Sequence, residues 1–209
     1  MMNVLVVTGG IGSGKSEVCR ILARNGLAAQ YNADVKVKEL YSSVPGLVES
    51  IESYLGCKLR DEDGKFQPQL LAQRIFYDKG ALEIVETLVF PELASDFRSF
   101  AESSSQNIVV FESATILEKP QFDGFGDKVI LVDAPMRTRL ERASSRDGAD
   151  KEKILARMAN QRLMNELSEG GSDPRIDAVV LNDGTLEELE HKVDEVMSGL
   201  YKDWRKDIV

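Results

Sequence analysis

Short apolar runs alternate with longer amphipathic stretches along most of this chain. Residues 3–8 form the first run, which is rich in β-branched valine and bounded by glycine, and this pattern predicts a strand buried on both faces. Comparable runs follow at residues 27–31, 107–112, 128–133 and 176–182. Because helical patterns separate these runs, the sequence predicts an α/β fold with a doubly wound parallel sheet flanked by helices.

A glycine-rich loop joins the first predicted strand to the next predicted helix. It matches the pattern G-x-x-x-x-G-K-[ST], the phosphate-binding loop of P-loop NTPase-type proteins. Its glycines let consecutive backbone N–H groups turn toward an anion, and the helix N-terminus adds to that attraction. We expect Lys15 to contact the β- and γ-phosphates of a nucleotide and the Ser16 hydroxyl to ligate Mg²⁺. The candidate phosphate-binding residues are Gly9, Gly10, Ile11, Gly12, Ser13, Gly14, Lys15 and Ser16.

Residues 44–105 show no strand pattern as clear as the first one. They are mostly amphipathic with helical spacing, and we expect interruptions at Gly56, residues 61–64, residues 79–80 and Pro91. This pattern is typical of a helical insertion. Beside a nucleotide-binding core, we expect such an insertion to hold the second substrate.

The segment after the fourth predicted strand differs in charge from the rest of the chain. Residues 136–162 contain eight basic and four acidic residues, although the chain as a whole has a net charge of −9. Arg142 and Arg146 are four residues apart and therefore share one helix face. The segment fits either a mobile lid whose arginines bind phosphates or a solvated helix with internal ion pairs.

These segments together predict a single P-loop domain with insertions over residues 1–209. It is expected to consist of a core, a helical acceptor-binding insertion and a lid. The core would occupy residues 1–43, 106–135 and 176–209, the insertion residues 44–105, and the lid residues 136–170.

Asp34 follows one predicted strand and Asn182 ends another, at the sheet edge where ligands bind in open α/β folds. Asp34 fits three roles: it can orient and deprotonate an acceptor hydroxyl, hold a metal through water, or cap a helix over residues 35–41. Asn182 fits either a contact to the nucleotide base or stabilisation of its turn.

Three further charged side chains allow more than one interpretation. Arg74 lies among apolar neighbours and fits either a ligand contact or an exposed position, the latter being the more common case. Glu112 and Glu118 lie near a predicted strand end, where acidic groups are more often solvated than functional.

The overall composition argues against several classes of function. The net charge of −9 disfavours a general nucleic-acid binder, because such proteins need cations to displace phosphate counterions. No uninterrupted apolar stretch approaches the roughly 18 residues of a membrane span, and no basic segment leads into a hydrophobic one at the N-terminus. We therefore expect a cytoplasmic protein without membrane contact. Cys19 and Cys57 form no metal or redox spacing.

A nucleotide-dependent switch or GTPase is a competing interpretation. Residues 61–64 and 123–126 both match D-x-x-G by letter. However, the guanine-reading motif N-K-x-D does not occur in the sequence. We interpret both D-x-x-G matches as accidental.

The chain resembles the dephospho-CoA kinase family over nearly its whole length. The most specific segment is T-G-G-I-G-S-G-K-S at residues 8–16, and the Asp-Ala-Asp motif of the family has its counterpart in residues 32–34. Residues 133–135 and Arg142 and Arg146 resemble the strand and lid of the family, and residues 182–184 resemble its adenine-side loop.

This resemblance implies transfer of a phosphoryl group from ATP, with Mg²⁺, to dephospho-CoA, the final step of coenzyme A synthesis. It implies that Asp34 is the base for the acceptor hydroxyl, that Arg142 and Arg146 contact ATP phosphates, and that Asn182 lies on the adenine side. We also expect Arg74 and Glu118 in the acceptor site. The alternative is another P-loop kinase of a nucleoside monophosphate or small molecule. We expect a monomer or weak homo-oligomer.

The chain departs from the family pattern at five places, one of which is a small insertion at residues 169–175. Asn32 replaces the first acid of Asp-Ala-Asp, and Pro68 stands where an arginine is usual. Phe90 replaces a common histidine, and Ala114 begins a segment that replaces Pro-Leu-Leu-x-Glu. These departures lie mainly in the expected acceptor region and leave the ATP-binding motif intact.

Overall fold

The computed structural model describes residues 2–201, apart from the side chain of Asn25. The chain divides into two compact units. The first consists of Met1–Asn32 and Ser104–Val209, and the second of Ala33–Ser103. The second unit therefore overlaps most of the predicted helical insertion.

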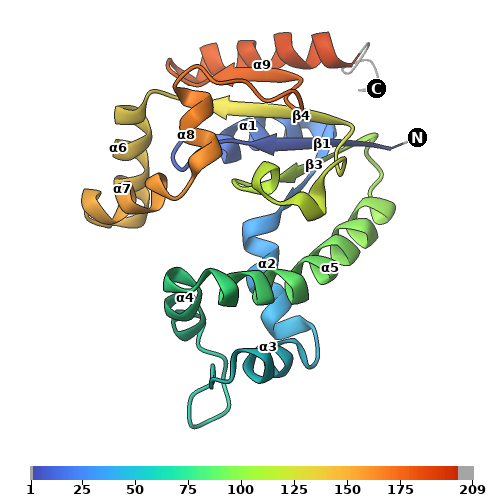
Figure 1. Ribbon diagram of the computed structural model, residues 1–209. Helices are drawn as coiled ribbons and strands as arrows, with labels where there is room; N and C mark the ends of the chain where they lie inside the picture. The colour runs from blue at the N-terminus through green and yellow to red at the C-terminus, as the bar shows by residue number, and fades with distance from the viewer. Residues whose placement is uncertain (1, 202–209) are drawn as a thin grey trace. The chain divides into compact units, whose positions relative to one another are not determined.

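A parallel sheet forms the centre of the first unit (Figure 1). The sheet found in residues 2–201 consists of β1 (Asn3–Thr8), β2 (Ala28–Asn32), β3 (Ile108–Glu112), β4 (Lys128–Asp133) and β5 (Ala178–Leu181). Its order is β2-β3-β1-β4-β5, and all neighbouring strands are parallel. The predicted fold class is confirmed. β2 begins and ends one residue later than predicted, and β5 is shorter than predicted at both ends.

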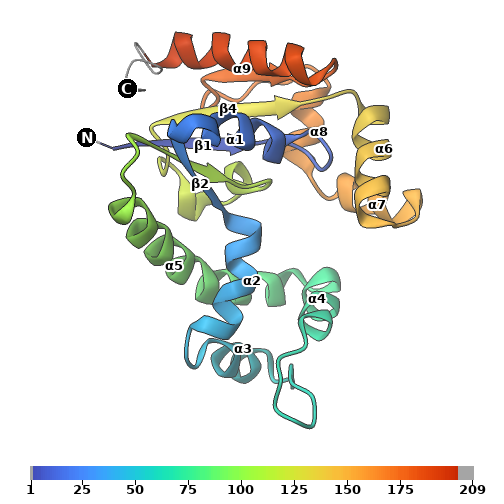
Figure 2. The ribbon, with the colours of Figure 1, turned by 180° about the vertical axis from the view of Figure 1, so that it is seen from behind.

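Alternating side chains of the strands build a core on each face of the sheet. Leu5 and Val7 of β1 pack in one buried cluster with α1 (Lys15–Ala23) and α9 (Leu186–Leu200), which lie against the sheet in Figure 2. Val6 points to the opposite face because successive strand side chains alternate. On that face Phe111 packs against Phe122 and Phe125, which belong to the segment that follows β3. This segment contains the short 3-10 helices η2 (Ile116–Glu118) and η3 (Pro120–Phe122).

Helices follow both of the last two strands. After β4 come α6 (Met136–Asp147), α7 (Lys151–Ala159) and α8 (Arg162–Ser168), in the predicted lid segment. After β5, Thr185 and Glu188 form a capping box at the start of α9, since each side chain accepts a hydrogen bond from the backbone N–H of the other.

The second unit is helical, with α2 (Ala33–Ser43), α3 (Leu47–Leu55), α4 (Pro68–Tyr77) and α5 (Lys79–Ser103). The expected interruptions at Gly56 and at residues 61–64 lie between α3 and α4. The interruption expected at residues 79–80 is misplaced, because these residues begin α5 and the break between α4 and α5 lies at Asp78. The predicted interruption at Pro91 is wrong, because α5 continues through it. One face of α5 is buried, and the helix contacts α2, α3 and α4. The free energy gained by this burial exceeds the cost of the backbone hydrogen bond that proline removes.

Among the described residues, no helix has both the length and the apolar character needed to cross a membrane. The longest candidate, α5, has 25 residues, but charged side chains are spread along it.

Candidate active site

The glycine-rich loop connects β1 directly to α1 in the first unit. Gly12 and Gly14 have φ angles of 77° and 99°, in the left-handed region that side-chain-bearing residues rarely adopt. A Cβ atom on Gly14 would also lie 2.1 Å from the Asn182 amide nitrogen. α1 begins at Lys15, so the loop leads straight into a helix N-terminus with its positive dipole end. The loop therefore has the geometry of a phosphate cradle.

Lys15 folds back over this loop. Its Nζ donates hydrogen bonds to the carbonyl oxygens of Gly9, at 2.9 Å, and Gly10, at 3.2 Å. A positive charge is thus held beside the turn where an anion would bind. Both acceptors are neutral carbonyl oxygens. A charged phosphate oxygen would compete with them for the Lys15 ammonium group, because charge-assisted hydrogen bonds are stronger.

Ser16, at the start of α1, lies beside the end of β3. Its Oγ donates a hydrogen bond of 2.6 Å to the Glu112 carboxylate. The other carboxylate oxygen accepts from Gln30 Nε2 at 3.0 Å and Asn32 Nδ2 at 2.8 Å. Glu112 is 4% exposed, so the interpretation of this residue as solvated is wrong. Burial, reinforced by Glu112, raises the pKa of the neighbouring Cys19 thiol well above its ordinary value.

Asn32 and Asp34 are two residues apart in sequence but belong to different units. β2 ends at Asn32, whose amide faces Glu112. α2 starts at Ala33, and Asp34 lies in the first turn of this helix rather than before it. The alternative that Asp34 caps the helix is therefore wrong.

Asn182 binds the phosphate-binding loop, and Arg142 binds Asn182. Arg142, on α6, donates to the Asn182 carbonyl oxygen at 3.2 Å and to its Oδ1 at 3.4 Å. The Asn182 amide, in turn, donates to the Ser13 carbonyl oxygen at 2.9 Å. Asn182 is 6% exposed. Its side chain thus links the loop after β5 to the phosphate-binding loop.

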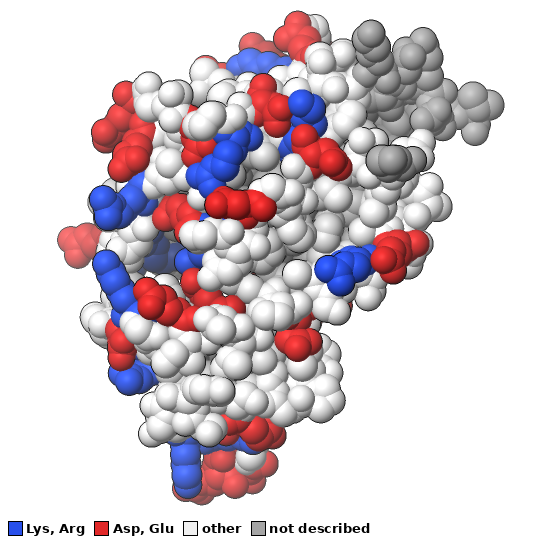
Figure 3. Space-filling view, turned by 45° about the vertical axis from the view of Figure 1, so that its right-hand side comes forward, with Lys and Arg blue, Asp and Glu red and all other residues white. Residues whose placement is uncertain are grey.

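Arg146 and most other charged residues of α6 and α7 form surface ion pairs. Arg146 and Arg157 both bind Asp147, at 2.7 Å, and these hydrogen bonds lower the pKa of Asp147 to about 2. Arg137 pairs with Glu141 on the same helix. On the face shown in Figure 3, blue basic side chains lie beside red acidic ones. The basic excess of this segment is therefore neutralised locally in part.

Arg74 and Glu118 have contrasting environments. Arg74, in the second unit, forms an ion pair with Asp78 at 2.9 Å, and its side chain is 45% exposed. Glu118, in η2 of the first unit, is half-buried, and this burial raises the pKa of its carboxyl. Its Oε1 has no hydrogen-bond partner among the described residues.

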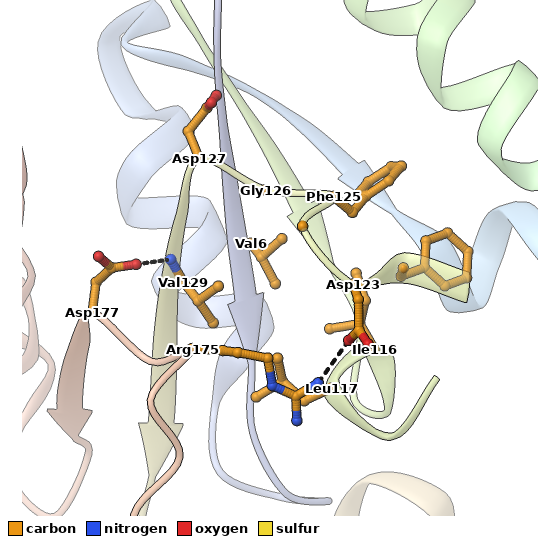
Figure 4. Close-up of a pocket in the computed structure, with 12 residues that line it drawn as sticks. Val6, Ile116, Leu117, Asp123, Phe125, Gly126, Asp127, Val129, Arg175 and Asp177 are labelled. Atoms are coloured by element: carbon orange, nitrogen blue, oxygen red, sulfur yellow. Dashed lines mark hydrogen bonds and ion pairs between the residues drawn. The ribbon is translucent and has the colours of Figure 1, made fainter. Parts of the chain in front are cut away.

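A small cavity of about 210 Å³ lies on the face of the sheet opposite α1 (Figure 4). Val6 and Val129 line it from β1 and β4, and Arg175 pairs with Asp123 at 2.9 Å on its rim. A Cβ atom on Gly126 would lie 2.6 Å from Val6. The second D-x-x-G match therefore forms a close-packed structural turn.

A parallel sheet whose first strand leads through G-x-x-x-x-G-K-S into a helix defines the class of P-loop nucleotide-binding proteins. The family model described as dephospho-CoA kinase matches residues 3–188. The chain belongs to the dephospho-CoA kinase family.

Individual relatives agree with this assignment. The dephospho-CoA kinase of Porphyromonas gingivalis is 36% identical over 172 residues, which cover 82% of this chain and 84% of the relative. That of Salinibacter ruber is 32% identical over 198 residues, covering 93% and 96%. Among solved structures, TT1252 from Thermus thermophilus has a TM-score of 0.80 at 26% identity, covering 96% of this chain and 98% of that one. Shikimate kinase from Acinetobacter baumannii shares the fold alone, with a TM-score of 0.53 at 16% identity and 97% coverage of both chains.

These findings confirm the predicted family, the enzyme class and the use of ATP as phosphoryl donor. Glu112 is the main candidate that sequence reasoning undervalued. One signal was present: an acidic residue ends an otherwise apolar strand. Because β3 pairs with β1, that residue comes to lie beside the phosphate-binding loop.

Proposed function

We propose that this chain transfers the γ-phosphoryl group of ATP to the ribose 3′-hydroxyl of dephospho-CoA and thereby forms coenzyme A. The main support is the family match across residues 3–188, which includes the phosphate-binding loop with Lys15 and Ser16. Phosphoryl transfer leaves little covalent chemistry to the protein, so positioning and charge neutralisation dominate.

Lys15 and Arg142 are the proposed cations of the site. Lys15 would exchange its bonds to Gly9 and Gly10 for the β- and γ-phosphates, and Arg142 would stabilise charge on the transferring group. The backbone of residues 9–16 would surround the phosphates, with Arg146 and Asn182 as further nucleotide contacts. We also propose that residues 136–170 act as a lid and residues 44–105 as the acceptor-binding insertion. Arg74 of the insertion and Glu118 of η2 are proposed contacts of the acceptor substrate.

Ser16 and Glu112 fit a magnesium site. A hydroxyl and a carboxylate lie 2.6 Å apart, both oxygen donors that suit a hard cation. The donors that Glu112 binds are neutral side chains, Ser16, Gln30 and Asn32, so a cation nearby would compensate its charge. Bound Mg²⁺ would neutralise the β- and γ-phosphate oxygens. We propose that Ser16 ligates it and that Glu112 orients Ser16.

Asp34 is the proposed base. It would orient the 3′-hydroxyl and accept its proton. Because a hydroxyl is a far weaker acid than a carboxylic acid, the proton should move late, as the new P–O bond forms.

A cytoplasmic location and a monomeric or weakly self-associating state stay predictions.

A product assay tests the proposed reaction. The protein is incubated with ATP, Mg²⁺ and dephospho-CoA, with adenosine and AMP as parallel acceptors, and products are identified by mass spectrometry. We expect coenzyme A to form in preference to every other product. If ATP binds but dephospho-CoA is not phosphorylated, the acceptor is assigned wrongly while the phosphate-binding loop is assigned correctly.

Glu112→Gln tests the proposed magnesium site. The variant keeps the shape of the side chain but removes its charge, and we expect the Mg²⁺ concentration needed for ATP binding to rise about 10- to 100-fold. Isothermal titration of ATP at several Mg²⁺ concentrations measures this, and ATP binding in EDTA should stay unchanged. Gln30→Met is the control, since it removes one neutral donor to the same carboxylate. Equal losses in both variants, or a loss in EDTA, would contradict the assignment.

A further inference from the structure

Ile11, in the middle of the phosphate-binding loop, is held from three directions by residues of the segment that follows β4. Its backbone N–H donates to Gln161 Oε1 at 2.8 Å. Its carbonyl oxygen accepts from Arg139 Nε at 3.1 Å. Its side chain packs against a buried apolar cluster of α6 and α7, formed by Ala143, Ile154 and Met158.

The two polar side chains of this arrangement are almost fully buried. Arg139 is 1% exposed and Gln161 is 5% exposed. Arg139 Nη1 also donates to Ser168 Oγ at 3.1 Å, and Ser168 donates to Asp133 Oδ1 at 3.0 Å. Asp133, 3.8 Å from the guanidinium, compensates its charge. The guanidinium is therefore fixed by β4 and α8 at the same time as it binds the loop.

Arg139 also fills the space that two loop glycines leave open. A Cβ atom on Gly10 would lie 2.0 Å from Arg139 Nη2, and one on Gly12 would lie 2.1 Å from the Arg139 carbonyl oxygen. Nη2 has no hydrogen-bond partner in residues 2–201. Burying an arginine with an unsatisfied donor costs stability, so this position favours a role in shaping the loop over a purely stabilising one.

We infer that Arg139 and Gln161 are positioning residues that hold the two peptide groups flanking Ile11 and keep the phosphate-binding loop in its binding shape. A loop with glycines at positions 9, 10, 12 and 14 has many accessible conformations, and ordering it on binding would cost affinity. Side chains that order the loop beforehand remove this cost. The inference rests on the proposed function only for the identity of the nucleotide.

The variants Gln161→Met and Arg139→Met test this inference. Each variant removes one hydrogen bond to the Ile11 backbone and leaves the backbone group that formed it buried and unsatisfied. A loss of this kind lowers the equilibrium constant for the ordered loop conformation by about 5- to 100-fold. We expect the Kd for ATP, measured by isothermal titration without acceptor, to rise about 10-fold for Gln161→Met and by at least as much for Arg139→Met. The KM for dephospho-CoA should stay within about twofold, and hydrogen exchange of the loop amides should accelerate.

Two matched controls separate this role from a general effect on the helices. Arg137→Met removes one charge from the same helix, but the Arg137 side chain is 89% exposed and forms an ion pair with Glu141 on the helix surface. Asn165→Leu removes a bond between Asn165 and the Met158 carbonyl oxygen, within the same segment. Both controls should change the Kd for ATP by less than about twofold.

Several outcomes would overturn the inference. An unchanged Kd and unchanged loop exchange in Gln161→Met would do so, as would equal weakening of ATP binding in Asn165→Leu. If Arg139→Met does not fold by circular dichroism, Gln161→Met decides. Because ATP binding is measured without acceptor, a failure to phosphorylate dephospho-CoA would refute the proposed function and leave this inference standing.

Discussion

Asp34→Asn is expected to lower kcat by about 10²- to 10⁴-fold while the Kd for ATP changes by less than about threefold. Asparagine preserves the size of the side chain but does not accept the proton of the acceptor hydroxyl, and general-base catalysis contributes on that order. Single-turnover phosphorylation of dephospho-CoA gives the rate, and isothermal titration gives the affinity for ATP. An equal loss of both would contradict the assigned role.

Glu39→Gln is the matched control for this variant. Glu39 lies on the same helix as Asp34 and pairs with Lys36 at 2.8 Å, so the control also removes one negative charge from α2. We expect its kcat to stay within about twofold of the unchanged protein. Removing the charge of Asp34 also weakens its interaction with the helix dipole, so the thermal midpoint of both variants should be compared.

Lys15→Met is expected to reduce kcat/KM for ATP by at least about 10²- to 10³-fold. Lys15 is held over the loop by the carbonyl oxygens of Gly9 and Gly10, and methionine keeps the length of the side chain without its charge. Loss of one preorganised donor to developing charge has effects of this size. Unlike Asp34→Asn, this variant should also weaken ATP binding, because the contact exists before transfer begins.

Lys153→Met controls for the loss of a positive charge. The Lys153 side chain is 77% exposed, and its amine is 4.0 Å from Asp150, in the same segment that carries Arg142. Its kinetics should match those of the unchanged protein. Lys15→Met should keep its fold, which circular dichroism would check. Normal kcat/KM for ATP in a folded Lys15→Met protein would contradict the proposed contact between Lys15 and the phosphates.

Local patterns were sufficient to predict the strands and the phosphate-binding loop. The apolar runs at 107–112 and 128–133 needed adjustment by at most one residue. The loop motif was recognisable because its chemistry depends on residues that are consecutive in sequence. Pro91 misled the prediction, because a proline signal is local whereas the burial of one face of α5 depends on neighbouring helices.

The surroundings of the loop could not be predicted in this way. Ser16 and Glu112 are 96 positions apart, and Ile11 and Gln161 are 150 apart. Glu112 was interpreted as solvated, since nothing nearby in the sequence indicates that β3 lies next to β1. Arg139 is one of eight basic residues in its segment, and its sequence context does not indicate that it is buried while Arg137, on the same helix, is exposed.

The sequence by itself therefore determined the strands, the glycine-rich loop and the family, because each depends on a pattern of neighbouring residues. Tertiary structure alone decided which charged and polar side chains face that loop. The physical reason is that the strand order β2-β3-β1-β4-β5 brings distant strand ends to one edge of the sheet. There Glu112 meets Ser16 on one side of the loop, while Arg139 and Gln161 bind it on another.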